Sequence, residues 1–355
     1  MSSDWIRRVF NRPLISKKTL VKKSYSKPIS TDDSEVNSEK TIVNNELSVD
    51  QTSLFAENLE SDFLNWILNC PVSLEITDSH SIRKKELNDK KYKLLTLIDH
   101  EMEGAILIPR RPASLPMLIK LLNDENSSHT QMSKILLSDP ALTSQILKTA
   151  NSPYFRSSSD DVETIEQAVL ILGRQGIRNI ISTTIMMPML KGEGSKEGPF
   201  SKRAWQWALL SASACCLYAQ VKDQDPGPLY LLGLLPSLAY LVVYRTLLRY
   251  EKTHPELGEI EPILIKSLLR SRSWKLCHVI CEQWGLPKNC ETYLLDAEKL
   301  SLDAVFAPLR DGMVLGMHKI LQRESTSPFN DNQLFSITCA STPTNNKVIE
   351  IMGKE

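Results

Sequence analysis

The chain has 355 residues, and its 42 Lys and Arg residues balance 42 Asp and Glu residues, so the formal net charge is zero. This charge balance argues against a protein that binds nucleic acid over most of its surface. The chain has only 13 glycines, which disfavours glycine-rich phosphate loops and favours helices. Its seven cysteines are an odd number, so we expect free thiols and a cytoplasmic location rather than a disulfide framework.

Residues 1–52 predict a disordered arm that is first basic and then acidic. Residues 1–28 carry eight basic residues and one acidic residue, whereas residues 29–62 carry nine acidic residues and one basic residue. Such segments bury too little apolar surface to offset chain entropy. The first twelve residues also match a short basic amphipathic helix, which indicates either a frayed terminus or a weak membrane-surface contact. Its apolar face would consist of Trp5, Ile6, Val9 and Phe10.

Residues 53–104 predict a separate helical segment, interrupted between Pro71 and Ser81, with a short strand-like alternation at 72–76. Further along, Leu229 to Tyr244 is uncharged but only sixteen residues long. A membrane-spanning helix needs about twenty apolar residues. We therefore expect a buried core helix there.

Helix start and stop signals dominate the chain after Pro109. Asp139 precedes Pro140, which is a typical capping pair at a helix start. The helix from Pro140 is expected to end at Asn151 in the left-handed conformation. A capping box made by Thr164 and Gln167 opens another helix, which Gly173 should close. Later helices are predicted near 201–220, 227–250, 259–271 and 273–284, a flexible loop at 191–198, and a flexible tail at 326–355.

The pattern of chemically active residues disfavours catalysis. The sequence contains no His-Asp dipeptide and none of the glycine-rich nucleotide-binding or nucleophile motifs. Cys277 and Cys281, with His278 and Cys290 nearby, leave zinc binding as the alternative to buried core thiols. Four tryptophans in the second half are expected in the core, with base stacking as the alternative: Trp205, Trp207, Trp274 and Trp284.

An ordered series of motifs across residues 107–185 resembles the HDOD family, the HD-related output domain of bacterial signalling proteins. The series runs LP at 115–116, ILLSDPALT at 135–143, ANSPYF at 150–155, TIEQA at 164–168, LG at 172–173 and IR at 177–178. The later WGLP at 284–287 is also similar to the family pattern. The signature residues, which we expect to be structural, are Asp139, Pro140, Asn151, Ser152, Gln167, Gly173, Trp284 and Pro287.

The resemblance implies an all-α, multi-helical, degenerate HD-like domain at about 105–325, between the helical segment 53–104 and the tail. In metal-dependent HD enzymes, histidines and aspartates hold a divalent metal that activates water. The positions that the resemblance assigns to such ligands here carry Trp207, Pro236, Ser237 and Ser273. We therefore expect no bound metal, no cofactor and no enzymatic activity.

The resulting hypothesis is a non-catalytic signal-transduction or scaffold module that binds a regulatory protein, with a cyclic dinucleotide as the alternative ligand and no extensive nucleic-acid binding. Two alternatives remain: a diverged metal-dependent phosphohydrolase with a rebuilt site, and a peripheral membrane-associated regulator recruited through residues 1–12.

Overall fold

The computed structural model describes residues 49–70, 81–123, 129–137, 140–151, 161–298, 307–324 and 330–353. Over these ranges the fold is all-α, as the sequence predicts, and contains no strand. The α-helices are α2 (Val49–Leu68), α3 (Ser81–Glu103), α4 (Leu115–Asn123), α5 (His129–Leu137), α6 (Pro140–Ala150), α7 (Ile165–Met186), α8 (Gly194–Val221), α9 (Leu229–Thr253), α10 (Pro262–Trp284), α11 (Lys288–Glu298), α12 (Pro308–Arg323), α13 (Asp331–Ser336) and α14 (Thr342–Gly353). A 3-10 turn at Pro255–Leu257 follows α9. Residues 1–48 of the expected arm at 1–52 and the strand-like residues 72–76 lie outside the described residues, whereas residues 49–52 belong to α2 and not to a disordered arm.

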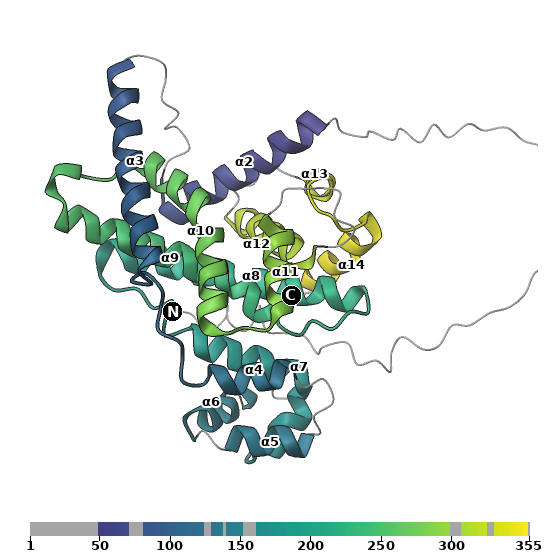
Figure 1. Ribbon diagram of the computed structural model, residues 1–355. Helices are drawn as coiled ribbons and strands as arrows, with labels where there is room; N and C mark the ends of the chain where they lie inside the picture. The colour runs from purple at the N-terminus through teal and green to yellow at the C-terminus, as the bar shows by residue number, and fades with distance from the viewer. Residues whose placement is uncertain are drawn as a thin grey trace, which may run out of the picture.

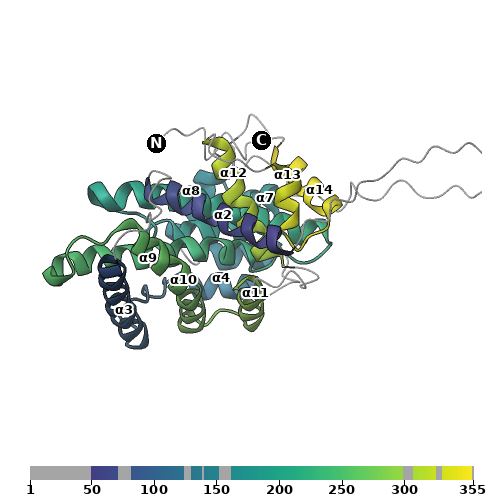
Figure 2. The same cartoon turned by 90° about the horizontal axis from the view of Figure 1, so that it is seen from above.

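The helices form two groups joined by α7. Helices α4, α5 and α6 pack against α7, which also packs against α9 (Figure 1). The larger group is built on α8, α9, α10 and α12, with α2 lying across it (Figures 1 and 2). Gly173, with φ of 64°, separates the two halves of α7. The expected helix boundary at this glycine is thus a sharp joint between the two groups.

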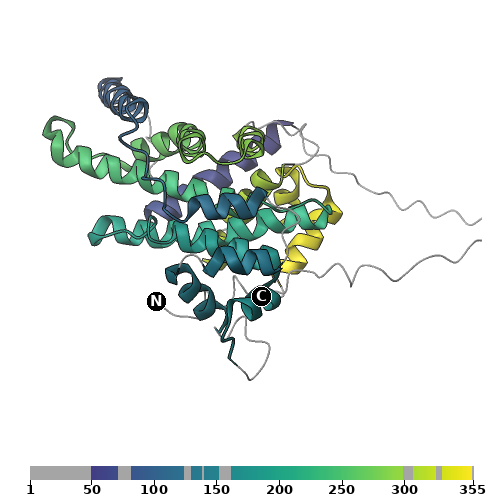
Figure 3. The ribbon, with the colours of Figure 1, turned by 60° about the horizontal axis from the view of Figure 1, so that its bottom comes forward.

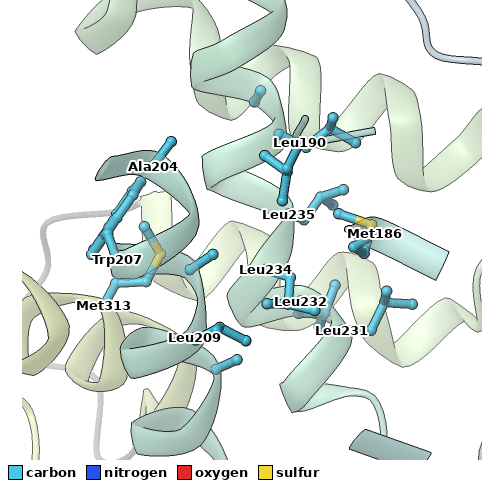
Figure 4. Packing of buried hydrophobic residues seen from close by; sticks show 14 of the residues in the cluster. Met186, Leu190, Ala204, Trp207, Leu209, Leu231, Leu232, Leu234, Leu235 and Met313 are labelled. Atoms are coloured by element: carbon cyan, nitrogen blue, oxygen red, sulfur yellow. The ribbon is translucent and has the colours of Figure 1, made fainter. Parts of the chain in front are cut away.

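The centre of the larger group is a close stack of long helices, seen in Figure 3 as ribbons running side by side. Glycines allow the backbones to approach, because a Cβ on Gly233 would lie 2.6 Å from the Ala212 Cα. A side chain at Gly312 of α12 would likewise collide with the Cys215 backbone of α8. Leucines of α9 are buried on several sides of this helix: Leu231, Leu232, Leu234 and Leu235 are all at most 1% exposed, and Figure 4 shows Leu235 beside Met186 of α7.

Helix α9 is the expected core helix of Leu229 to Tyr244. It is long and apolar enough to cross a membrane, and 89% of its most apolar window is buried inside the protein. Pro236 lies within this helix. Its burial among other helices explains the uncharged run without reference to lipid.

Two predicted boundaries are corrected. Residues 194–198 belong to α8 instead of a flexible loop, because Glu197 pairs with Arg245 of α9 and Lys196 pairs with Glu251. Residues 259–284 do not form two helices, since α10 continues from Pro262 to Trp284. Tertiary contacts outweigh the local Gly, Ser and Pro signals in both places.

Composition predicts a flexible tail over 326–355, but residues 331–336 and 342–353 form α13 and α14. The polar residues of this segment serve as caps and buried partners. Asn330 caps α13 in a capping box with Gln333. Asn345 is 0% exposed and accepts a hydrogen bond of 2.7 Å from the Tyr218 hydroxyl of α8. The segment therefore packs on the larger helix group.

Candidate functional site

The four positions that the resemblance assigns to lost metal ligands lie on three neighbouring core helices. Trp207 is on α8, Pro236 and Ser237 are on α9, and Ser273 is on α10. All four are buried, and α9 packs against both α8 and α10. The structure thus places these positions on adjoining buried helices.

Aromatic rings occupy the space around Trp207. Its ring centroid lies 4.6 Å from that of Phe63 and 5.1 Å from that of Tyr240. Phe63 is fully buried and comes from α2. Figure 4 shows Trp207 beside Met313 of α12. The region is therefore packed with large apolar side chains.

Polar contacts fasten α2 over this aromatic cluster. Glu60 pairs with Arg270 of α10 at 3.0 Å. Arg203 of α8 donates a hydrogen bond of 2.8 Å to the carbonyl of Ile67. Burial raises the pKa of Glu60, an effect that the nearby Arg270 charge partly offsets. Sequence reasoning placed α2 in a separate segment and missed its role, because no local pattern shows which core a helix will join.

The side chains at these positions do not fit a divalent metal. Proline has no side-chain ligand, and the indole Nε1 of Trp207 is a hydrogen-bond donor only. A serine hydroxyl is a poor ligand where imidazole and carboxylate are needed. Trp207 Nε1, Ser237 Oγ and Ser273 Oγ are buried without a hydrogen-bond partner. Over the described ranges, no three His, Cys, Asp or Glu side chains gather as a metal-binding group.

The signature residues of the first helix group have structural roles where they are described. Pro140 begins α6. Gln167 and Thr164 form the predicted capping box of α7. Asp139 and Ser152 lie outside the described residues.

Asn151, which directly follows α6, makes two side-chain hydrogen bonds to the backbone of Val162. Its Oδ1 accepts a hydrogen bond from the Val162 N–H at 2.6 Å, and its Nδ2 donates to the Val162 carbonyl at 2.8 Å. The expected left-handed conformation is wrong, since Asn151 is not among the residues with positive φ. The side chain acts across eleven residues instead of capping its own helix.

The WGLP motif connects the end of α10 with the chain before α4. Trp284 is 1% exposed, and its Nε1 donates a hydrogen bond of 3.0 Å to the Pro109 carbonyl. Gly285 ends α10 in the left-handed conformation, and the Pro287 carbonyl accepts from the Cys290 N–H at 2.9 Å. Trp205 and Trp207 are buried as expected, whereas Trp274 is only partly buried.

Arg178 is a buried connection between the two helix groups. It is 2% exposed, and its Nε and Nη2 donate to the Leu121 carbonyl of α4 at 3.1 and 2.8 Å. Its Nη1 lies 3.5 Å from Asp225, in the loop between α8 and α9. The IR motif contains this arginine, but only the fold shows that its guanidinium binds a backbone carbonyl in the last turn of α4.

A second buried polar network attaches the C-terminal helices. Asp311 of α12 is 0% exposed, and its Oδ1 accepts from the Cys339 N–H at 2.8 Å, while its Oδ2 has no partner. Burial raises the pKa of Asp311 to about 6. Asn345 donates to Thr338 and Ala340 while accepting from Tyr218. No sequence motif pointed to this network.

The fold defines a class of protein: an all-α domain over the described residues, built as two helix groups joined by α7. The HDOD domain model matches residues 108–298. The chain therefore belongs to the HDOD family. No curated protein matches the sequence.

Two solved structures of low sequence identity share the fold, and a third with a lower TM-score is also similar. An HDOD domain protein of unknown function from Geobacter sulfurreducens has a TM-score of 0.52 and 19% identity, covering 74% of this chain and 89% of its own. A protein from Shewanella amazonensis SB2B, provisionally assigned as a metal-dependent phosphohydrolase, has a TM-score of 0.50 and 17% identity, covering 74% and 99%. A provisionally assigned signal transduction protein from Marinobacter aquaeolei VT8 has a TM-score of 0.48 and 16% identity, covering 85% and 68%.

Proposed function

We propose that this chain is a non-catalytic signalling module of the HDOD family that acts in the cytoplasm by binding a regulatory protein. One observation supports the proposal: the positions that the resemblance assigns to metal ligands carry Trp207, Pro236, Ser237 and Ser273, which are buried, and Phe63 and Tyr240 pack around Trp207. A domain that keeps its scaffold without a ligand set can still present surfaces to a partner.

The alternative of a metal-dependent phosphohydrolase, the activity named for the Shewanella protein, needs several fixed ligands around one metal. The test uses the purified full chain with manganese, magnesium or iron, against cyclic-di-GMP and a chromogenic phosphodiester. We expect turnover no higher than in buffer with the same metal. His278, the imidazole flanked by Glu291 and Glu298, supplies the control variant His278→Ala. Turnover that co-purifies with the chain and disappears in this variant would refute the proposal.

Partner binding is tested directly. Affinity capture from the native host identifies a candidate, and the proposal requires that the purified candidate rebind the purified chain with a defined stoichiometry. Calorimetric titration with cyclic-di-GMP tests the dinucleotide alternative in the same buffer. Co-sedimentation with anionic vesicles, with and without residues 1–12, tests the membrane alternative. Binding to vesicles alone, lost with residues 1–12, would replace the protein-binding proposal with a membrane role.

A further inference from the structure

Helix α3 is fixed to the larger helix group along its second half. Leu94 and Ile98 are 0% exposed. Asp99 pairs with Arg272 of α10 at 2.7 Å and with Lys275 at 3.1 Å. Core packing and ion pairs therefore hold the second half of this helix in place.

The first half of α3 stands out from the rest of the protein (Figures 1 and 3). Residues 83–86 are four consecutive exposed positions. Successive residues of an α-helix are about 100° apart around its axis, so the helix is open to solvent on every side there. Further along, Tyr92 is 73% exposed. This free half, residues 83–93, is a rod about 10–12 Å across with its side chains.

The free half of α3 is strongly basic. It contains six Lys and Arg residues against Glu86 and Asp89, which gives a net charge of +4. Arg83, Lys84 and Lys85 are consecutive, so their side chains leave the helix axis in three different directions. The tip of the rod therefore carries cations on three of its sides.

These cations are little used inside the protein. Lys90 donates a hydrogen bond to the Glu259 carbonyl. The other five form no ion pair with any described residue: Arg83, Lys84, Lys85, Lys91 and Lys93. On neighbouring helices, by contrast, Arg249 and Arg270 each pair with a carboxylate. Like charges this close together repel one another, and an external anion removes that repulsion.

The arrangement of the cations distinguishes between anionic partners. A flat bilayer or a single acidic helix meets only one side of a rod. The major groove of B-form DNA is about 12 Å wide, admits an α-helix and has a phosphate backbone along each edge. The major groove of duplex RNA is deep and too narrow for such a helix. Charge and shape together therefore favour duplex DNA.

We propose that the free half of α3 binds duplex DNA in the major groove, with Arg83, Lys84, Lys85 and Lys91 contacting the phosphates. The whole chain has a net charge of zero and this half has +4, so the remainder carries −4. DNA contact is therefore local, which agrees with the absence of an extensive basic surface. DNA binding at α3 is separate from the proposed protein binding, because either can fail without the other.

The experiment measures fluorescence anisotropy of a labelled DNA duplex of arbitrary sequence, titrated with the purified full chain. The titration is repeated at several salt concentrations between about 50 and 200 mM, where phosphate contacts are most sensitive to salt. Each phosphate contact adds about 0.9 to the slope of log K against log salt. We expect a slope of about −3 to −4 for the four contacts.

Two triple variants with the same change in net charge locate the site. Arg83→Glu, Lys84→Glu and Lys85→Glu together reverse the tip of α3. Acidic residues suit the first turn of a helix, so this variant should fold as well as wild type, which circular dichroism checks. It should bind DNA at least about tenfold more weakly at low salt, with a slope shallower by about 2–3.

The matched control reverses three exposed lysines on other parts of the fold: Lys222→Glu, Lys288→Glu and Lys347→Glu. Charges farther from the DNA than a Debye length of about 10 Å are largely screened. The control should therefore keep its affinity within about threefold of wild type and its slope unchanged.

A second measurement needs no variant. Lysines of the wild-type chain are acetylated with and without DNA, and the modified positions are mapped by mass spectrometry. We expect DNA to protect Lys84 and Lys85, while Lys222 and Lys347 are modified equally in both samples.

Four results would overturn the proposal. One is no binding at the lowest salt concentration. Another is equal loss of affinity in the two triple variants. The third is full binding by the α3 variant, which would assign the DNA to another part of the chain, such as the basic residues 1–28. The last is equal or tighter binding of duplex RNA, or binding of phosphatidylserine vesicles in place of DNA.

Discussion

Asp311 offers a test of the buried network that attaches the C-terminal helices. Its side chain is 0% exposed, and desolvation raises its pKa from 3.8 to about 6. The Cys339 and Ala340 amides and the Arg310 charge act in the opposite direction but are weaker. We expect Asp311→Asn to stabilise the protein at neutral pH, because an amide oxygen still accepts from the Cys339 N–H without carrying a buried charge.

The sign and size follow from linkage. A carboxyl group with a raised folded-state pKa contributes stability that is fully present below pH 3.8 and is lost as the pH rises through about 6. A shift of roughly two units corresponds to about 3 kcal/mol. Asp311→Asn should therefore match wild type near pH 4. At pH 7.5 it should be more stable by about 1–3 kcal/mol, since the amide gives up the charge-assisted part of the hydrogen bond.

The assay is urea unfolding followed by circular dichroism at pH 4.5, 6.0 and 7.5, with the free energy of unfolding compared between variant and wild type at each pH. Asp99→Asn is the control. Burial raises the pKa of Asp99, but hydrogen bonds and charges from Arg272 and Lys275 outweigh it and lower the pKa. Asp99 contributes stability that is fully present above its unfolded pKa of 3.8 and is lost only as the pH falls below it, so the difference for Asp99→Asn should stay constant between pH 4.5 and 7.5. A pH-independent difference for Asp311→Asn, or destabilisation at every pH, would refute the reasoning.

Three further substitutions test the scaffold by urea midpoint. Asn151→Leu should lower stability by about 1–2 kcal/mol, because it leaves both Val162 backbone groups without these hydrogen bonds; an unchanged midpoint with lost partner binding would make Asn151 a contact residue. Arg178→Lys should cost about 1–3 kcal/mol, since one ammonium cannot reproduce the fork on Leu121 and Asp225; a neutral result would show that the fork adds nothing. Phe63→Ala should cost about 3–5 kcal/mol, whereas Leu54→Ala on the same helix, 55% exposed, should stay within about 0.5 kcal/mol; equal effects would contradict the packing of α2 on the core.

Local chemistry made part of the fold predictable. The capping box at Thr164, the start at Pro140 and the stop at Gly285 each depend on neighbouring residues, and all three appear in the structure. The start of α8 at Gly194 and the continuity of α10 depend on partners far along the chain, such as Arg245 and Asp99. Sequence periodicity contains no information about those partners.

In the candidate site, too, local sequence features could be predicted and contacts between distant residues could not. The positions that the resemblance assigns to metal ligands, and the absence of histidine and aspartate there, can be read from the sequence alone. What replaces them could not be located. Phe63 precedes Trp207 by 144 positions, and Asn345 follows Tyr218 by 127. Such pairs are determined by how whole helices pack, so only the structure shows that α2 covers the core and that α14 is attached to α8.

Placing histidine and aspartate at the positions that the resemblance assigns to metal ligands would not create a metal site. The reasons are the volume of the surrounding side chains and their chemistry. His and Asp at positions 236 and 237 would still lie in a helix layer with the Trp207 ring between Phe63 and Tyr240. Interiors are close-packed, so added polar side chains have no room for a metal and its water. An ionised aspartate without a partner would also carry the cost of burying a charge. In this chain, apolar contacts from α2 fill the core around Trp207 instead.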